Sequence, residues 1–210
     1  MFKCFAGCGG GSAPSQIVMF GLDGAGKTTL LYRLKLQWKD ITHALENIRE
    51  QNADPGYHYE EFTSKIVRSY GIWDVPGTPE MIPMWPAFYR YVQVCAVLFV
   101  VNGSDEFAGQ DERIIQAREL MFKLLQEDEL RNAAFILIIN DHEPETTEVE
   151  LQLETRSNFE FLCDCLGVAE IEATNTHFHP VHFNCSKITH ASPEWKRVLD
   201  MILQSQLAAR

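Results

Sequence analysis

A glycine-rich segment between an apolar run and a helical pattern constrains this chain more than any other feature. Gly21–Thr28 reads Gly-Leu-Asp-Gly-Ala-Gly-Lys-Thr and fits the phosphate-loop pattern G-x-x-x-x-G-K-[ST]. Apolar residues 17–20 precede it, and residues 29–31 open a helical pattern. In this strand–loop–helix context, consecutive backbone N–H groups point from a helix N-terminus at an anion, and the helix dipole favours that charge. The segment therefore predicts a site for nucleotide phosphates.

Two side chains and the main chain of this loop are expected to contact the phosphates and the metal ion. Lys27 is expected to reach the β- and γ-phosphates, and the Thr28 hydroxyl to bind Mg²⁺. The remaining phosphate contacts are expected from the other loop residues, which are Asp23, Gly24, Ala25, Gly26 and Thr29.

Composition bounds the class of protein. The 210 residues are 46% hydrophobic, which is enough for one sizeable core, and the net charge is −11. That charge argues against non-specific binding to nucleic acid or to an anionic membrane surface. No apolar run approaches the roughly 20 residues that span a bilayer, and the start lacks a signal-peptide core. We therefore expect a cytoplasmic protein with reduced cysteines.

The chain divides into a tail and one domain. Residues 1–15 are rich in glycine and cannot build a core, so they are predicted to form a flexible tail before a domain at 16–210. Within the domain, strand and helix patterns alternate. Strands are predicted at 16–20, 57–63, 66–74, 94–101, 133–140 and 181–184, and helices at 28–39, 111–126, 148–166 and 193–207.

This alternation predicts an α/β fold. The strands at 94–101 and 133–140 are nearly all apolar, as in parallel strands covered on both faces, while 57–63 and 66–74 read as a hairpin. Ligands of such sheets bind at the carboxyl ends of the strands. Gly21, Asp74, Asn140 and Cys185 follow four strands and are expected to form one pocket.

A second motif carries a family resemblance. Trp73–Gly77 reads Trp-Asp-Val-Pro-Gly and looks like the W-D-V-G-G switch segment of Arf-type proteins, whose phosphate loop has the wording seen here. Over about 16–208 the chain resembles small Ras-like GTPases of the Arf/Arf-like family. The resemblance implies a P-loop NTPase domain with a Ras-like, mostly parallel sheet and helices on both faces. It also implies a switch that binds GTP or GDP with Mg²⁺.

The resemblance assigns roles to individual residues. Asp74 would hold Mg²⁺ through water, and the Gly77 amide would meet the γ-phosphate. Asn140 would read guanine, and the loop containing Cys185 and Ser186 would support the base.

It also implies protein partners. Effectors, exchange factors and GTPase activators would bind through the switch loops of a monomer. The apolar residues after the second switch are expected to lie in the core or to face such a partner; these are Met81, Met84 and Trp85.

The chain departs from the family pattern at positions that the family uses for GTP hydrolysis and base binding. Thr78 stands where the family has a glutamine that orients the attacking water, so we expect very slow GTP hydrolysis. Pro76 replaces a glycine, which removes a backbone donor and stiffens the segment. The base motif N-K-x-D appears as Asn140-Asp141-His142-Glu143. Glu143 keeps the carboxylate, whereas Asp141 replaces a lysine and is expected to weaken guanine binding.

The first switch is altered as well. Aligning on Gly56 puts Asp54 where the family has a threonine that ligates Mg²⁺, and a carboxylate is a good Mg²⁺ ligand. The preceding segment 37–53 is longer than the family's first switch and has helical spacing. A surface insertion without a nucleotide role explains it equally well.

The tail and a histidine group leave further alternatives open. Cys4 and Cys8 can be S-palmitoylated, giving peripheral membrane contact, or the tail can be unmodified. His177, His179 and His182 suggest a metal site, but exposed histidines in an edge loop before the last strand are favoured.

Two other functions compete with an Arf-like switch. The first is a pseudo-GTPase that acts as a structural adaptor, which Thr78, Pro76 and Asp141 favour. The second is a P-loop enzyme that uses another nucleotide.

Overall fold

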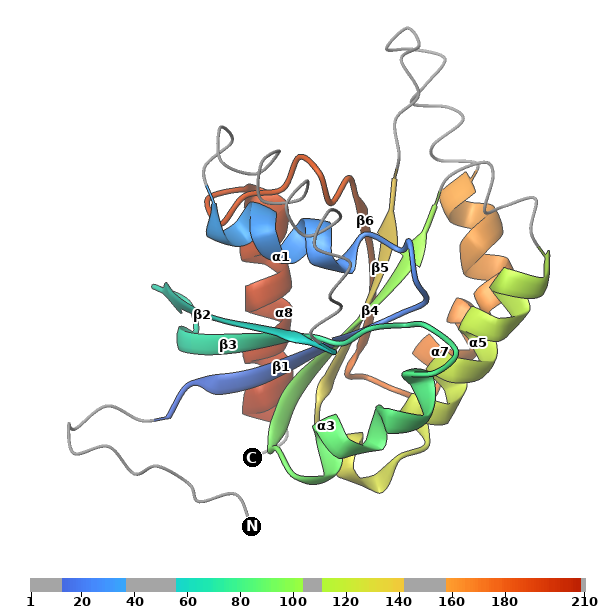
Figure 1. The fold of residues 1–210 in the computed structure, drawn as a ribbon, viewed down its shortest axis with the longest axis horizontal. Coiled ribbons are helices and arrows are strands. Elements are labelled where there is room, and N and C mark those ends of the chain that lie inside the picture. The colour runs from blue at the N-terminus through green and yellow to red at the C-terminus, as the bar shows by residue number, and fades with distance from the viewer. Residues whose placement is uncertain (1–12, 37–55, 104–110, 142–157, 209–210) are drawn as a thin grey trace, which may run out of the picture.

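The computed structural model describes residues 13–36, 56–103, 111–141 and 158–208, which form a sheet with helices on both faces (Figure 1). The strands are β1 (Ser15–Phe20), β2 (His58–Ser64), β3 (Arg68–Asp74), β4 (Val94–Asn102), β5 (Ala134–Asn140) and β6 (Phe178–Phe183). The helices are α1 (Lys27–Lys35), α3 (Pro86–Arg90), α5 (Asp111–Leu125), α7 (Val168–Glu172) and α8 (Pro193–Ala208), with short 3₁₀ turns at Ile82–Met84 and Asp128–Leu130. Residues 158–166 are also helical.

The six strands form one sheet in the order β2-β3-β1-β4-β5-β6. Only β2 is antiparallel to its neighbour, and β1, β3, β4, β5 and β6 run parallel. All residues of β5 and nearly all of β4 are buried because these central strands are covered on both faces. The carboxyl ends of the parallel strands therefore meet at one edge, which is where α1 begins.

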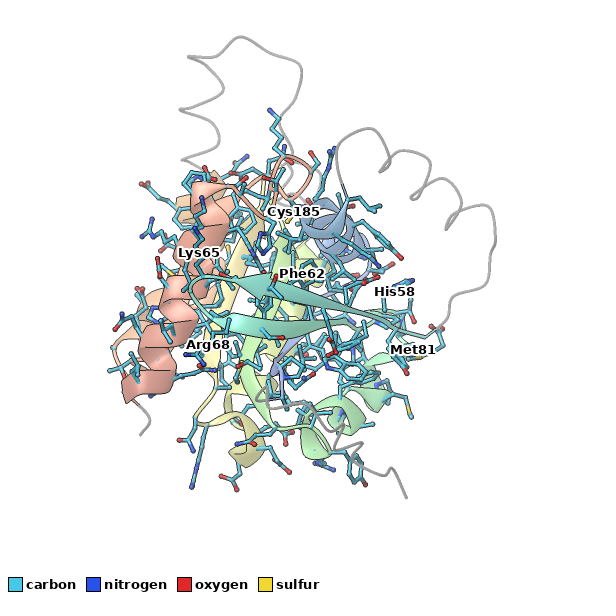
Figure 2. All side chains as sticks on the ribbon, turned by 90° about the vertical axis from the view of Figure 1, so that its left-hand side faces the viewer. His58, Phe62, Lys65, Arg68, Met81 and Cys185 are labelled. Atoms are coloured by element: carbon cyan, nitrogen blue, oxygen red, sulfur yellow. The ribbon has the colours of Figure 1, made fainter. Side chains whose placement is uncertain are left out.

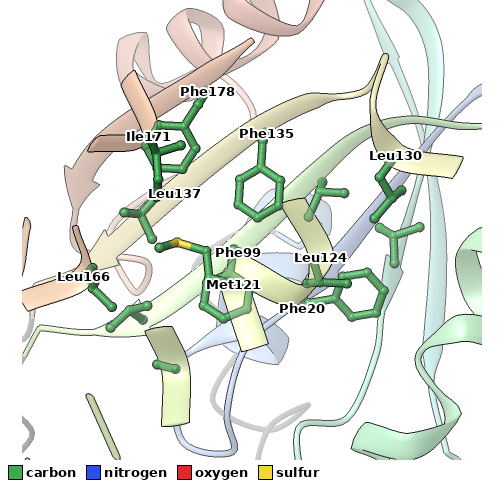
Figure 3. Close-up of a cluster of buried hydrophobic side chains, with 14 of the residues drawn as sticks. Phe20, Phe99, Met121, Leu124, Leu130, Phe135, Leu137, Leu166, Ile171 and Phe178 are labelled. Carbon is green, nitrogen blue, oxygen red and sulfur yellow. The ribbon is translucent and has the colours of Figure 1, made fainter. Parts of the chain in front are cut away.

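Two apolar layers flank the sheet. On one face, α1 and α8 pack against the sheet and bury Leu30, Leu31 and Trp195. On the other, α5 and residues 158–166 cover the cluster of buried hydrophobic side chains shown in Figure 3, where Met121 of α5 lies over Phe99. Buried positions recur every three or four residues along α5, which is the pattern of a helix with one face toward the core. No helix within the described ranges is both long and apolar enough to cross a bilayer.

The predicted mostly parallel α/β sheet is confirmed, with differences at several element ends. The last strand begins at Phe178 rather than Val181, because Pro180 is tolerated in an edge strand such as β6. The first helix was predicted to reach residue 39 but ends at Lys35, where Leu36 adopts an extended backbone. The expected helical segment 37–53 and the tail cysteines Cys4 and Cys8 lie outside the described residues. The short helices α3 and α7 were not predicted.

Candidate functional site

The phosphate loop joins β1 to α1 through backbone that only glycine adopts easily. Gly21, Gly24 and Gly26 have φ angles of 139°, 72° and 99°. Space adds a second constraint, since a Cβ on Gly21 would lie 2.1 Å from the carbonyl oxygen of Val100. Gly26 is also the N-cap of α1, so the loop ends where the first backbone N–H groups of the helix have no intrahelical acceptor. The loop has the geometry of an anion site.

The Lys27 side chain folds back over this loop. Its ammonium donates to the carbonyl oxygens of Gly21 at 2.8 Å and Leu22 at 2.9 Å, which uses two of its three N–H bonds. The residue is 6% exposed. Burial lowers the pKa of Lys27, while the negative charges of Asp74 and Asp23 oppose that shift. The loop therefore carries a buried cation at its centre.

Two hard oxygen donors meet beside this cation. The Thr28 hydroxyl donates to Oδ2 of Asp74 at 2.6 Å, which ties the start of α1 to the end of β3. Because the proton points at Asp74, the hydroxyl lone pairs remain for a further partner. Hydroxyl and carboxylate oxygens are the ligands that Mg²⁺ prefers, so this donor set fits the ion. Asp54, the third predicted metal ligand, lies outside the described residues.

The predicted switch segment lies directly on the loop. A Cβ on Gly77 would come within 1.9 Å of the Gly21 carbonyl oxygen, so a side chain has no room there. The Gly77 carbonyl accepts a hydrogen bond from the Asp23 N–H at 3.3 Å. Thr78 follows, and its carbonyl accepts from the N–H groups of Met81 and Ile82, which starts the turn into the 3₁₀ segment. The segment is thus fixed by backbone contacts.

Two of the apolar residues after this segment have different environments. Trp85 is 3% exposed and its indole N–H donates to the Pro76 carbonyl at 2.9 Å, so Trp85 belongs to the core. Met84 is 53% exposed.

Asn140 links the phosphate loop to the loop after β6. Its side-chain N–H₂ donates to the Ala25 carbonyl at 2.9 Å, and its side-chain oxygen accepts from the Cys185 N–H at 2.8 Å. Asn140 is 1% exposed. Ser186 is held by the side chain of Asn184, which accepts hydrogen bonds from both its N–H and its hydroxyl. The four segments that the sequence placed at one rim therefore lie side by side.

Asp141 contacts the last strand of the sheet. Its Oδ2 lies 3.5 Å from Nε2 of His182 on β6, and the ring of His182 packs on Phe159. Asn140 faces the layer of α1, whereas Asp141 faces the layer of residues 158–166, as alternation along an extended chain requires. Glu143, predicted to bind the base, lies outside the described residues.

Sequence reasoning missed two residues that contact the site. Arg113, in the first turn of α5, donates to the Asp23 carbonyl at 2.6 Å and lies 3.2 Å from its carboxylate. A cation in the first turn of a helix is unfavourable next to the helix dipole, so Arg113 needed a nearby anionic partner. This unusual position is the signal in the sequence that could have identified the contact. His58 is the other: its Nδ1 lies 3.5 Å from Oδ2 of Asp74. In Figure 2 it lies at one end of β2, with Lys65 and Arg68 at the far end of the hairpin.

The histidine group near the last strand differs from its predicted setting. His179 lies within β6 rather than in a preceding loop, and it is half-buried beside Ser205. His182 also lies in β6, inside the bounds of the predicted strand. Among the described residues, no group of three His, Cys, Asp or Glu side chains is placed to hold a metal ion.

Comparisons with known proteins agree with this geometry. The sequence model of the ADP-ribosylation factor family matches residues 1–177. The fold is similar to that of the Arl6 BBS3 small GTPase from Trypanosoma brucei with the bound nucleotide analogue GppNp, at a TM-score of 0.60. That match covers 94% of this chain and 98% of the other, and its 19% identity indicates a shared fold. The predicted Ras-like P-loop architecture is confirmed, and the chain belongs to the ADP-ribosylation factor family of small GTP-binding proteins.

Proposed function

We propose that this protein is a molecular switch that binds GTP or GDP with Mg²⁺ and hydrolyses GTP very slowly. One observation carries the proposal: a buried lysine held over a glycine-rich loop at the start of α1. Lys27 has one N–H beyond the two that bond Gly21 and Leu22, and it directs a positive charge to the place where the helix dipole also favours an anion. The amides of residues 23–29 would complete the phosphate site.

The metal would be held by the oxygen donors next to this loop. Thr28 would bind Mg²⁺ directly, and Asp74 would hold one of its water ligands. Their 2.6 Å contact supports the assignment because it orients the hydroxyl. Asp54 remains a proposed additional ligand.

Base recognition would rest on Asn140 and its surroundings. Asn140 fixes the loop of Cys185 and Ser186 against the phosphate loop, so a base between them would meet a preformed wall. Glu143 would accept hydrogen bonds from guanine. Because Asp141 replaces the family's lysine, we expect guanine affinity and selectivity to be lower than is usual for such a motif.

Hydrolysis would be slow because Thr78 stands at the water-orienting position. A threonine side chain is shorter than glutamine and carries no amide, so it cannot hold the water and contact the phosphate together. Gly77 would still contact the γ-phosphate through its amide, and this would let the switch segment respond to the nucleotide without rapid turnover.

Protein effectors would recognise the switch surface, and exchange factors or GTPase activators would use it too. Tyr57, Trp73 and Phe88 form a cluster of aromatic rings with centroids 5.4–6.3 Å apart, and Tyr57 is 46% exposed. Met84 lies nearby in sequence and is exposed. Aromatic and methionine side chains are enriched at protein interfaces. We propose a role in membrane traffic, with the protein cytoplasmic or peripheral on a membrane through Cys4 and Cys8.

An adaptor that holds nucleotide permanently, or none, is the second candidate. It is favoured by Thr78 and by Asp141, which depart from the family at the two positions needed for turnover and base choice. An enzyme of another nucleotide is the third candidate, since the phosphate loop alone does not select the base.

The identity of the bound nucleotide separates these functions. Purified protein is denatured, and the released nucleotide is separated by chromatography and quantified. We expect GDP or GTP at near one per chain. Protein that carries no nucleotide and does not bind a fluorescent GTP analogue at micromolar concentration would contradict the switch, and bound adenine nucleotide would support the third candidate.

A further inference from the structure

A histidine that the proposed function does not use lies next to the metal-binding carboxylate. His58 and Asp74 are directly opposite each other in the antiparallel pairing of β2 with β3. Side chains of opposite residues start about 5 Å apart, so the backbone itself sets this contact. The carboxylate of Asp74 is 4% exposed, and a buried charge needs polar partners. In the described residues, the Thr28 hydroxyl and the His58 ring both face its Oδ2.

The imidazole is also held from the side of α1. The ring of Tyr32 meets the ring of His58 edge-on, with centroids 5.8 Å apart and planes at 69°. Thr28 and Tyr32 are four residues apart, so they lie on the same face of α1. Three contacts thus link the four side chains in series across α1, β2 and β3, from Thr28 through Asp74 and His58 to Tyr32. An ion pair between Lys35 and Glu60 adds a further link from α1 to β2.

We propose that His58 is a positioning residue for the metal site: its ring holds the Asp74 carboxylate in the orientation that accepts the Thr28 proton. This inference rests on the proposed function. Asp74 keeps the hydroxyl proton turned away from the metal, and the lone pairs of Thr28 then face the ion. Removing a group that orients a metal ligand through a contact typically changes metal affinity about 10–100-fold.

The test compares variants that keep or remove the polar nitrogen. His58→Phe keeps an aromatic ring against Tyr32, and His58→Asn keeps a short polar amide. Release of a fluorescent GDP analogue is measured over a range of free Mg²⁺ and in excess EDTA. We expect His58→Phe to raise the Mg²⁺ concentration for half-maximal slowing about tenfold. Its release rate in EDTA should stay within about twofold of wild type, and His58→Asn should recover much of the loss.

Two further measurements keep the role distinct from general loss of structure. Electron paramagnetic resonance of added Mn²⁺ reports metal affinity without following turnover, and it should show the same order among the variants. Tyr32→Leu removes the edge contact and leaves His58 in place, so a smaller shift in the same direction is expected. The matched control is Thr63→Ala, an exposed change on β2 that should leave both measurements unchanged.

Each contrary result has a definite meaning. An unchanged Mg²⁺ dependence in His58→Phe overturns the proposal, as does faster release to the same degree with and without Mg²⁺. A preference of wild type for Mn²⁺ or Co²⁺ that disappears with His58 would make the ring a direct ligand and also overturns it. If wild type binds the analogue but Mg²⁺ does not slow its release, the metal part of the proposed function fails with it. Absence of any binding would contradict the whole proposed function.

Discussion

Two parts of one pocket rim are built in different ways. Around the phosphate loop, separate segments bond to it: Asn140 to Ala25, Asp74 to Thr28 and Arg113 to Asp23. Thr78 and Asp141, two positions that depart from the family pattern, contact other segments. Thr78 supports the turn that follows it, and Asp141 pairs with His182 on the outer strand.

We infer from this difference that the proposed nucleotide binding and the proposed hydrolysis depend on separate contacts. A side chain added to the phosphate loop would disturb packing between several elements, because a Cβ on Gly21 would lie 2.1 Å from the Val100 carbonyl oxygen and one on Gly26 would lie 2.3 Å from the Asn140 side-chain nitrogen. Thr78 can change without disturbing such contacts, since its backbone carbonyl forms the turn. We therefore expect variants at the first group to abolish binding or folding, and variants at the second to tune rates.

The largest effect is expected from Lys27→Ala. It removes a buried cation and the proposed charge-assisted bond of its third N–H to a phosphate, worth about 1.5–3 kcal/mol, so nucleotide affinity should fall about 10- to 100-fold. Equilibrium titration with a fluorescent GDP analogue measures this loss. Lys196→Ala, an exposed change on α8, serves as control and should bind like wild type. Retained affinity in Lys27→Ala would show that the loop does not bind phosphate.

Asn140→Ala tests whether the loops are held by the asparagine itself. The change leaves the Ala25 carbonyl and the Cys185 N–H without their side-chain partner inside a buried region, at about 1–3 kcal/mol for each group. We expect the free energy of unfolding to fall by about 2–4 kcal/mol in urea titrations. The half-buried Asn175, which accepts one backbone bond from His177, is the comparison. Equal decreases in the free energy of unfolding for Asn175→Ala and Asn140→Ala would contradict the view that Asn140 holds the two loops together.

Thr78→Gln tests the other part of the rim. Glutamine supplies an amide that can orient water, so single-turnover GTP cleavage should rise about tenfold, which is less than the roughly 100- to 10,000-fold of a fully positioned acid–base group. Thr78→Ala should leave the wild-type rate nearly unchanged. No rise in Thr78→Gln would indicate that Pro76 or the altered first switch, rather than Thr78, limits hydrolysis.

Much of the fold can be predicted from local sequence patterns. Central strands β4 and β5 are apolar runs, and parallel topology then brings Gly21, Asp74, Asn140 and Cys185 to one edge. The contact between His58 and Asp74 cannot be predicted from such patterns, because it depends on the register of the hairpin. The predicted hairpin leaves a two-residue turn at 64–65, which would place Asp74 opposite residue 55. The structure has a longer turn that ends at Arg68 with a φ of 61°, and this register places His58 there.

The same limit applies to Asp141. Alternation along β5 predicts that Asn140 and Asp141 point to opposite faces, but the partner of Asp141 depends on the register of β6. That strand starts three residues before the predicted one, at Phe178, and its pairing brings His182 beside Asp141. Registers between strands distant in sequence are set by packing that a single segment does not encode.

The smallest effect is expected from pH, and it probes the sheet edge far from the loop. His179 on β6 is half-buried near Ser205; burial lowers its pKa, and so does the charge of His177, while Glu172 opposes the shift. The unfolded chain has a histidine pKa near 6.5, so it takes up a proton at a higher pH than the folded chain. The His179 contribution is thus fully present above about pH 6.5 and is lost as pH falls from there toward the folded pKa. Urea unfolding at pH 7.5 and 5.5 should show a smaller pH difference in His179→Gln than in wild type. His182→Gln, on the same strand, should retain this His179-linked loss. An unaltered difference in His179→Gln would mean that another group sets the acid sensitivity of β6.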